Sequence, residues 1–165
     1  MIFTTYKRWK HLFSLLCIIF LGIVSYVLQP QENIHRKIVE YDYTVDGDTI
    51  YLIEDGTRQK YRLLMVDCPE ATSEIEPYGL EATTFTKTRL ENASGIEIEY
   101  EKENETDMYG RSLVWVYVDG KLLQEELARV GLVEQLYTGS FRYEKEVREA
   151  LDYAKTNFIG IYKKD

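Results

Sequence analysis

Histidine and cysteine are scarce in this 165-residue chain, and their positions exclude several kinds of site. The two histidines, His11 and His35, precede the first predicted strand, so no imidazole is available as a base or metal ligand in the domain that follows. Cys17 lies in an N-terminal apolar segment, which leaves Cys68 as the only thiol beyond it. An internal disulfide and a structural zinc site are therefore excluded. No glycine-rich phosphate loop is present, so any chemistry must come from carboxylates and arginines.

Positive charge is also scarce outside the N-terminus. Three of the 20 basic residues lie before residue 28 and all 28 acidic residues lie after it, which leaves 17 basic residues against 28 acidic ones and a net charge of −11. A protein that binds nucleic acid through its overall charge is expected to be basic. Recognition of a phosphate by this chain must therefore be local, from a few placed arginines assisted by a cation.

The N-terminus differs in kind from the rest of the chain. Residues 12–28 form an uncharged apolar run that follows Lys7, Arg8 and Lys10. The run is short for a membrane-spanning helix and long for a signal-peptide core, and its basic flank predicts that the following domain is exported. We expect residues 1–28 to be an uncleaved signal-anchor helix that tethers the domain to the cell membrane, with residues 29–37 as a linker. The alternative is a cleaved signal peptide and a secreted, extracytoplasmic protein.

Hydrophobic periodicity predicts five strands and three helices in the remaining chain. The strands are expected at residues 38–44, 49–54, 58–66, 96–100 and 113–118, and the helices at residues 78–92, 122–130 and 143–157. Leu80, Phe85 and Leu90 are expected to face inward from the first helix, and Gly131 to end the second. This order is typical of an α+β, mainly β domain, a five-stranded Greek-key OB-fold barrel with three helices over residues 38–165. It also suits other small α+β folds.

The stretch from Tyr61 to Glu70 is predicted to be a buried strand that ends in a cluster of charge. The continuous apolar run Leu63–Val66 is typical of a strand covered on both faces. Arg62 lies near its start, Asp67 and Glu70 lie past its end, and a proline between them stops the strand. Two carboxylates and an arginine at this exit suit a metal and phosphate site. The alternative is an ordinary turn.

Two further segments carry candidate chemistry. Asp46–Asp48 (Asp-Gly-Asp) places two carboxylates on the same side of an extended chain, although Asp-Gly also occurs in plain turns, as expected at Asp55 and Asp119. Arg111 follows a glycine at the entry to a strand. Its guanidinium can bind two phosphate oxygens at once, and the alternative is a solvated charge at a sheet edge.

Five segments in order closely resemble the staphylococcal nuclease (thermonuclease) family, over about residues 38–162. They are Val45–Ile50, Arg62–Glu70, Tyr78–Ala82, Asp107–Leu113 and Val118–Lys121. The resemblance implies an OB-fold barrel and a calcium-dependent phosphodiesterase that cleaves DNA and RNA, single strands preferred, to 3′-phosphorylated products. A monomer is expected.

The resemblance also implies a Ca²⁺ site. Asp48 and Asp67 match direct carboxylate ligands of the metal, and the backbone carbonyl of Cys68 matches a further one. Asp46 and Glu70 would bind the metal through water. The bottom-up chemistry agrees, because calcium prefers several hard oxygen ligands in loose geometry.

The same resemblance implies the catalytic and substrate-binding residues. Glu70 matches the proposed general base, which orients or activates water. Arg62 and Arg111 match the arginines that hold the scissile phosphate, and Tyr109 and Tyr137 match tyrosines that contact the nucleotide. A cation and two arginines would stabilise the negative charge that builds on phosphorus during hydrolysis.

The sequence departs from the family pattern at several positions. Cys68 stands where threonine is usual, Met108 replaces a lysine, and Gly139 replaces a second nucleotide-contacting tyrosine. The loop after Glu70 contains no lysine. We expect weaker substrate affinity but an intact catalytic set. Two alternatives are a non-catalytic nucleic-acid-binding or scaffolding module, and a surface protein whose acidic patch binds calcium for structural reasons only.

Overall fold

The structure is a computed structural model that describes residues 17–21, 35–101 and 106–164. The predicted signal-anchor and linker lie almost wholly outside the described residues, apart from a helical piece at residues 17–21 and the end of the linker. Within the described ranges, no helix is long and apolar enough to cross a membrane. His35–Asp165 forms a unit of its own, and it is this unit that carries every predicted site residue.

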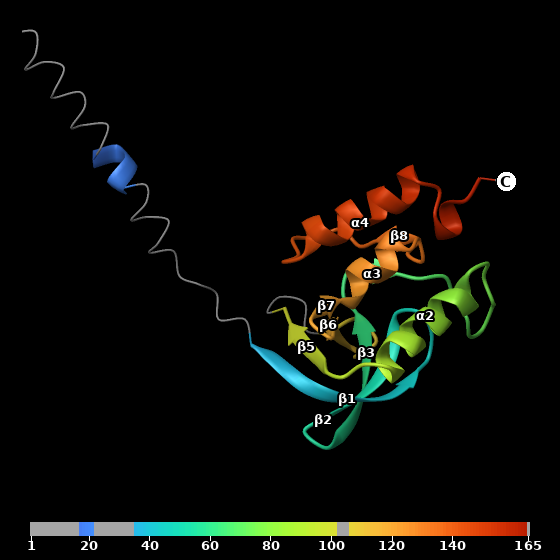
Figure 1. Cartoon of the computed structure of the whole chain (residues 1–165). Coiled ribbons are helices and arrows are strands. Elements are labelled where there is room, and N and C mark those ends of the chain that lie inside the picture. The colour runs from blue at the N-terminus through green and yellow to red at the C-terminus, as the bar shows by residue number, and fades with distance from the viewer. Residues whose placement is uncertain (1–16, 22–34, 102–105, 165) are drawn as a thin grey trace, which may run out of the picture. The chain divides into compact units, whose positions relative to one another are not determined.

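A closed five-stranded barrel forms the centre of this unit (Figure 1). Its strands are β1 (Arg36–Thr44), β2 (Thr49–Glu54), β3 (Thr57–Leu63), β5 (Ile96–Tyr100) and β6 (Ser112–Val118). Antiparallel pairing runs in the order β3-β2-β1-β5-β6, and a parallel pairing of β3 with β6 closes the barrel. The predicted α+β class and five-stranded barrel are confirmed.

Helices and short strands complete the fold outside the barrel. The helices are α2 (Gly79–Glu91), α3 (Leu123–Arg129) and α4 (Glu144–Thr156), followed by the short 3₁₀ helix η1 (Gly160–Tyr162). Strand β7 (Lys121–Leu122) pairs with β6, and β4 (Val66–Asp67) pairs with β8 (Gln135–Leu136). Helix α2 packs against β1, and α3 packs between β6 and α4. Apart from η1 and these two-residue strands, the predicted elements lie within a few residues of the observed ones.

Two of the three Asp-Gly pairs are tight hairpin turns, as predicted. Asp55 and Gly56 between β2 and β3 both have positive φ, at 50° and 74°, and Asp119 and Gly120 between β6 and β7 likewise, at 52° and 77°. Such angles match the twist of the flanking strands. Asp46 lacks this conformation, so the Asp-Gly-Asp segment is a different kind of loop.

The predicted strand 58–66 is wrong beyond Leu63. Leu64 and Met65 form a bend, with Met65 at a φ of 72°, and the chain then leaves β6 to pair with β8. The backbone N–H of Leu64 still donates to Val114 of β6 at 2.9 Å, whereas Met65 accepts from Tyr137 at 2.8 Å. The apolar run Leu63–Val66 is therefore apolar because it is buried, and it does not form one continuous strand.

One other boundary and one helix face also differ from prediction. Strand β1 begins at Arg36, within the predicted linker, because Arg36 pairs with Glu99 of β5. In α2, Leu90 is buried and Phe85 partly buried, but Leu80 is 55% exposed, so its prediction as an inward residue is wrong. Small residues occupy most of the barrel-facing side of α2, which brings the helix close to the barrel.

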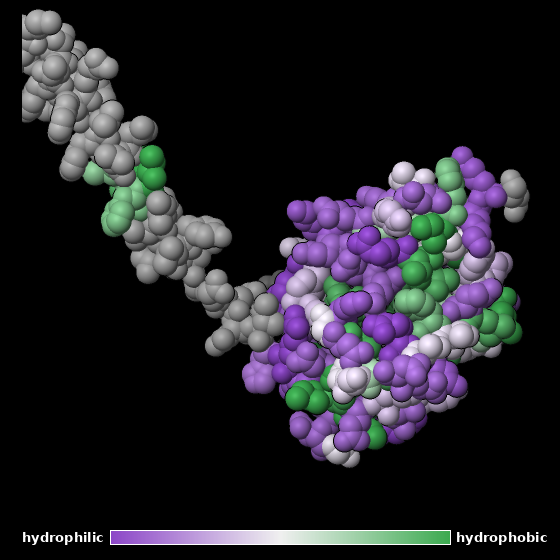
Figure 2. Space-filling view, in the orientation of Figure 1, coloured by the Kyte–Doolittle hydropathy of each residue, from purple (hydrophilic) through white to green (hydrophobic). Residues whose placement is uncertain are grey.

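The core lies inside the barrel and beneath the helices. Trp115 of β6 is fully buried, and ring edges of Phe141 and Tyr143 pack against it at centroid distances of 6.4 and 5.2 Å. From α4, Val147, Ala150, Leu151 and Ala154 are buried at helical spacing. Helix α3 ends at Arg129, and Gly131 just beyond its cap residue Val130 has a positive φ of 69°, which confirms the predicted stop. The face in Figure 2 is mainly hydrophilic, with hydrophobic residues between α2 and α3.

A buried carboxylate fixes the start of α4 to the barrel. Glu99 of β5 is 1% exposed, accepts a hydrogen bond from the Tyr143 hydroxyl at 2.8 Å, and forms an ion pair with Arg142. Glu101 accepts from the Trp115 ring N–H at 2.7 Å and from the backbone N–H of Arg142 at 3.0 Å. Removing a buried carboxylate from such contacts costs more than the contacts contribute.

We expect Glu99→Ala to lower the free energy of unfolding by about 3–5 kcal/mol, because Arg142 and the Tyr143 hydroxyl then lose their buried acceptor. The control is Glu97→Ala on the same strand, whose side chain is 38% exposed and 4.0 Å from Arg36; it should cost at most about 1 kcal/mol. Urea unfolding of both variants checks the difference. Equal effects would show that the Glu99 contacts do not hold α4.

Candidate functional site

Helix α2 holds the Asp46–Asp48 loop in place. The buried Thr86 hydroxyl donates to the carbonyl of Gly47 at 2.6 Å. A Cβ at position 47 would lie 2.7 Å from the Cβ atoms of both Ala82 and Cys68, so a side chain at this position would force the loop off the helix. Glycine here allows the close approach that fixes the two flanking carboxylates.

Asp48 is the most deeply buried of the predicted site carboxylates, at 1% exposure. It accepts hydrogen bonds from the backbone N–H of Cys68 at 2.7 Å and from the Thr49 hydroxyl at 3.1 Å, and forms an ion pair with Arg62. Its own backbone N–H donates to Asp46 at 3.1 Å. Burial raises the pKa of Asp48 to about 8, with the nearby Asp46 adding to the effect and Arg62 opposing it.

Arg62 of β3 bridges two carboxylates that come from different loops. Its Nη1 pairs with Asp48 and its Nη2 with Asp67, and Nη2 also donates to the carbonyl of Val66 at 3.4 Å. The side chain is 8% exposed. Burial disfavours the charged guanidinium, but the two carboxylates outweigh it and raise the pKa of Arg62. Arg62 therefore supplies the counter-charge for both acids.

The Cys68 thiol has no nucleophilic role in this arrangement. Burial, together with the negative charge of Asp48, raises the pKa of the thiol well above its usual value, so the thiol stays protonated. The sulfur packs close to Gly47, and the backbone N–H is the group that contacts Asp48. The contact of Cys68 with Asp48 is made by the backbone N–H, whereas the resemblance assigns the backbone carbonyl as a metal ligand, which stays a prediction.

The donor set around Asp48 suits a hard cation. The side chains of Asp46, Asp48 and Asp67 offer only oxygen atoms as ligands. Within the described part of the chain, however, no three histidine, cysteine or acidic side chains converge on one point. Asp48 and Asp67 instead face each other across the Arg62 guanidinium.

The β4–β8 pair places Tyr137 beside this network. Asp67 pairs with Gln135 across the two short strands, and the backbone N–H of Tyr137 donates to the carbonyl of Met65 at 2.8 Å. The Tyr137 ring is 46% exposed. Burial and the charge of Asp67 raise the pKa of its hydroxyl, which therefore stays protonated at neutral pH.

A rigid turn presents Arg111 and Tyr109. The Asp107 carboxylate accepts the backbone N–H groups of Tyr109 and Arg111, both at 2.9 Å, and the Arg111 Nε at 2.6 Å. Burial opposes the charged form of Asp107, but the N–H groups of Arg111 and Tyr109 prevail and lower its pKa. Parallel pairing of Arg62 with Leu113 brings the end of this turn beside β3.

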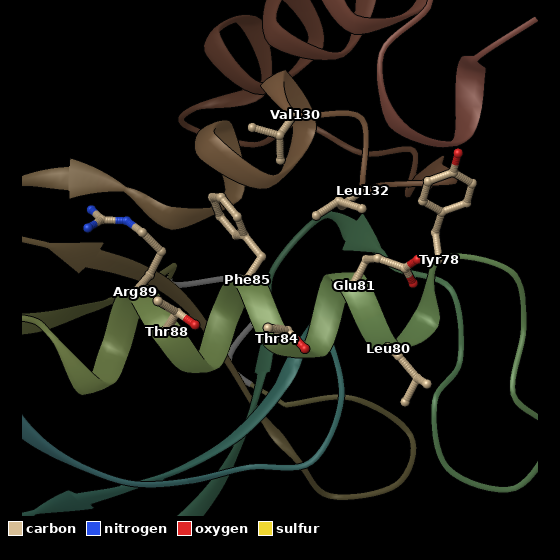
Figure 3. A pocket seen from close by; sticks show the side chains of 9 residues that line it. All are labelled: Tyr78, Leu80, Glu81, Thr84, Phe85, Thr88, Arg89, Val130 and Leu132. Atoms are coloured by element: carbon tan, nitrogen blue, oxygen red, sulfur yellow. The ribbon is translucent and has the colours of Figure 1, made fainter.

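One cavity collects both arginines and both tyrosines predicted from the sequence. It has a volume of 390 Å³ and is lined by Arg62, Arg111, Tyr109 and Tyr137, together with Asp107 and Met108. A second hollow, of 640 Å³, lies between α2 and α3, where Phe85 points toward Val130 and Leu132 (Figure 3). None of the predicted site residues lines the second hollow. The candidate site is therefore the first.

Glu70 lies at the start of the loop that leads to α2, and it is exposed. Its carboxylate accepts from the Thr72 hydroxyl at 3.2 Å, and its backbone N–H donates to Glu76 at 2.7 Å. Among the described residues, no ion pair joins Glu70 to Arg62 or Arg111. The structure thus places Glu70 in a loop that these two hydrogen bonds hold in place. Glu70 lies outside the lining of the cavity that contains the arginines and tyrosines.

Comparison with known proteins identifies the family of this chain. A family model described as "Staphylococcal nuclease homologue" matches residues 60–164, more than half of the chain. The chain belongs to the staphylococcal nuclease family. The match includes Arg62, Asp67, Glu70 and Arg111 and begins after Asp48. The family predicted from the sequence motifs is confirmed, and so is the enzyme class, a nuclease.

Individual relatives extend over most of the chain. Endonuclease YncB of Bacillus subtilis is 36% identical over 142 residues, covering 82% of this chain and 67% of that protein. The thermonuclease of Staphylococcus hyicus is 36% identical over 127 residues, covering 74% of each. The thermonuclease of Staphylococcus intermedius is 32% identical over 124 residues, covering 73% of each.

Sequence reasoning missed the residues that hold the site in position. Thr86 and Gly47 fix the first acidic loop, and Asp107 orients Arg111. The role of Asp107 could have been predicted, because its spacing of four residues from Arg111 suits a closed turn. The role of Thr86 could not, since its contact with Gly47 spans 39 positions of the sequence.

We expect Gly79→Ala to destabilise the protein by about 1–3 kcal/mol, because the added Cβ would lie 2.1 Å from the Glu70 carbonyl oxygen. The backbone of Glu70 must then move. Gly95→Ala is the control, since no atom lies within 4 Å of its added Cβ. Thermal unfolding of both variants measures the effect, and equal melting temperatures would contradict the close contact of α2 with Glu70.

Proposed function

We propose that this protein is an extracytoplasmic, membrane-tethered, calcium-dependent nuclease. It hydrolyses phosphodiester bonds of DNA and RNA, with single strands preferred, to 3′-phosphorylated products, and it acts as a monomer. The observation that carries the proposal is the cavity shared by Arg62, Arg111, Tyr109 and Tyr137. Relatives named endonuclease and thermonuclease, at 36% identity, support the same reaction class.

The two arginines bind the phosphate in this proposal. Arg111 is held by Asp107 through its Nε, which leaves the terminal nitrogens of the guanidinium for phosphate oxygens. Arg62 is buried and pre-positioned by Asp48 and Asp67. Negative charge that develops on the phosphate oxygens during attack is stabilised more strongly by such fixed donors than by water.

In this proposal carboxylates bind the metal, and Glu70 acts on the attacking water. Asp48, Asp67 and the Cys68 carbonyl would bind Ca²⁺ directly, with Asp46 bound through water. When bound, calcium supplies positive charge that polarises the phosphoryl oxygens. Glu70 orients the attacking water or takes its proton, and its exposed position leaves room for that water. Tyr109 and Tyr137 contact the nucleotide.

Membrane tethering rests on the N-terminal sequence alone. The uncharged run of residues 12–28 and its basic flank support a signal-anchor. The mass of the mature protein, recovered from cells and from medium, discriminates an intact N-terminus from a cleaved one.

The second candidate function is nucleic-acid binding without cleavage. It is favoured by one observation, the position of Glu70 outside the lining of the cavity that holds the two arginines. A binding module would retain its affinity and show no product in the presence of calcium. Product formation decides between the two.

We expect the full chain in detergent to cleave a single-stranded oligonucleotide with Ca²⁺ and to stop when EDTA removes the metal. Arg111→Ala should lower kcat by about 10²–10³-fold, because one donor to the transition state is lost. Arg148→Ala, an exposed arginine paired within α4, is the matched control and should keep full activity. Mass spectrometry of the products should show 3′-phosphates. An uncleaved substrate at high enzyme concentration would refute the proposal.

We expect Ca²⁺ to stabilise the folded protein directly. At a concentration 100 times its dissociation constant, calcium should add about 2.7 kcal/mol to the free energy of unfolding. Asp67→Asn should abolish this shift, whereas Asp152→Asn, an exposed acid on α4, should retain it. Thermal unfolding with and without calcium measures the effect without reference to activity. A shift that survives Asp67→Asn would place the cation elsewhere.

A further inference from the structure

The cavity at the candidate site has two chemically different walls. Arg62 and Arg111 supply its positive charge, and both are already paired with carboxylates. Met108, Tyr109 and Tyr137 line the same cavity and supply apolar and aromatic surface. A nucleotide has the same two parts, a charged phosphate and a flat base with apolar faces.

Exposure marks these three side chains as a contact surface. Met108 is 88% exposed, Tyr109 76% and Tyr137 46%. A single exposed apolar side chain needs no explanation, but several around one cavity indicate a binding surface. The cavity volume of 390 Å³ falls within the range of about 300–1,000 Å³ that small-molecule sites have.

The turn that carries Met108 is held before any ligand arrives. The Asp107 carboxylate accepts two backbone N–H groups of the turn, and the Gly110 N–H donates to the Asp107 carbonyl at 3.0 Å. Met108 therefore projects from a fixed backbone, which lowers the entropy lost on binding. Its thioether is polarisable and makes favourable contacts with aromatic rings.

The residues around this cavity carry too little positive charge to bind a nucleic acid through its phosphates alone. The loop after Glu70 adds Glu74 and Glu76 and no basic residue, and the chain carries a net charge of −8. Attraction between the protein and the phosphate backbone is thus limited to the two cavity arginines in the described site. Contacts to the bases must supply a larger share of the affinity than in a basic nuclease.

From this placement we propose that Met108 is a base-contacting, specificity-determining residue. Its thioether and the rings of Tyr109 and Tyr137 form an apolar surface that takes a nucleobase of the bound strand. The arginines hold the neighbouring phosphate. Affinity then depends on the bases and only weakly on salt. This inference rests on the proposed nuclease function and names how that same site recognises its substrate.

The experiment compares two single-stranded oligonucleotides of equal length, one with bases and one fully abasic. Binding is measured with calcium in a Glu70→Gln background, so that the strand stays intact. Met108→Ala should weaken binding of the base-containing strand about threefold to tenfold and leave the abasic strand unchanged. Met108→Leu should restore most of the loss, because it keeps the apolar contact.

A charge variant and a surface control complete the test. Met108→Lys should steepen the salt dependence, with the slope of log Kd against log salt changing by about 0.7 for one added phosphate contact on a single strand. Ile38→Ala, an 81% exposed apolar residue on β1, should change neither affinity. In the cleaving enzyme, Met108→Ala should raise KM by the same factor and leave kcat unchanged.

Each outcome decides the role of Met108. If Met108→Ala weakens binding of both strands equally, or weakens binding of neither, the proposed role of Met108 is wrong. Cleavage by the unsubstituted chain would still support the nuclease function. Binding without cleavage by the unsubstituted chain refutes the nuclease function and leaves the strand comparison valid. No binding of either strand refutes both.

Discussion

The ion-pair network of Arg62 is the interaction on which the rest of the site depends. Two carboxylates, Asp48 and Asp67, reach it from different segments, and the buried Asp48 would be costly to hold without the guanidinium. Removing one partner of such a network costs about 3–5 kcal/mol, a large part of the stability of a small domain. The same network brings together two predicted metal ligands and Arg62, which we propose binds the phosphate. Stability and the proposed chemistry thus involve the same three side chains.

Backbone contacts hold this network in the barrel. Thr86 and the close approach at Gly47 fix the loop that carries Asp48, and the bend at Met65 turns the chain so that Asp67 pairs with β8. That bend also sets Tyr137 beside the network. A continuous strand through Met65 would carry Asp67 further along β6 and away from Tyr137. The departure from the predicted strand is therefore what assembles one side of the cavity.

An acidic nuclease must attract a polyanion with little help from its overall charge. In this chain the two cavity arginines are the positive groups of the described site, and each is oriented by a carboxylate. A carboxylate partner cancels part of the positive charge of each arginine but fixes the direction of its guanidinium. A fixed direction matters most in the transition state. The exposed apolar side chains around the same cavity offer the remaining contact energy through the bases. Such a division makes binding less sensitive to salt than a lysine-rich surface would.

The sequence by itself determined the strand and helix order, the two hairpin turns and the identity of the chemical groups, because these depend on local periodicity and on short motifs. Asp-Gly turns and helix spacing are set by neighbours in the chain. The tertiary structure decided which groups meet: Arg62 with Asp48 and Asp67, Thr86 with Gly47, and Asp107 with Arg111 around one cavity. It also decided that Leu80 faces out and that the apolar run bends at Met65. Burial and long-range pairing set these features, and a single sequence records the need for burial but not its direction.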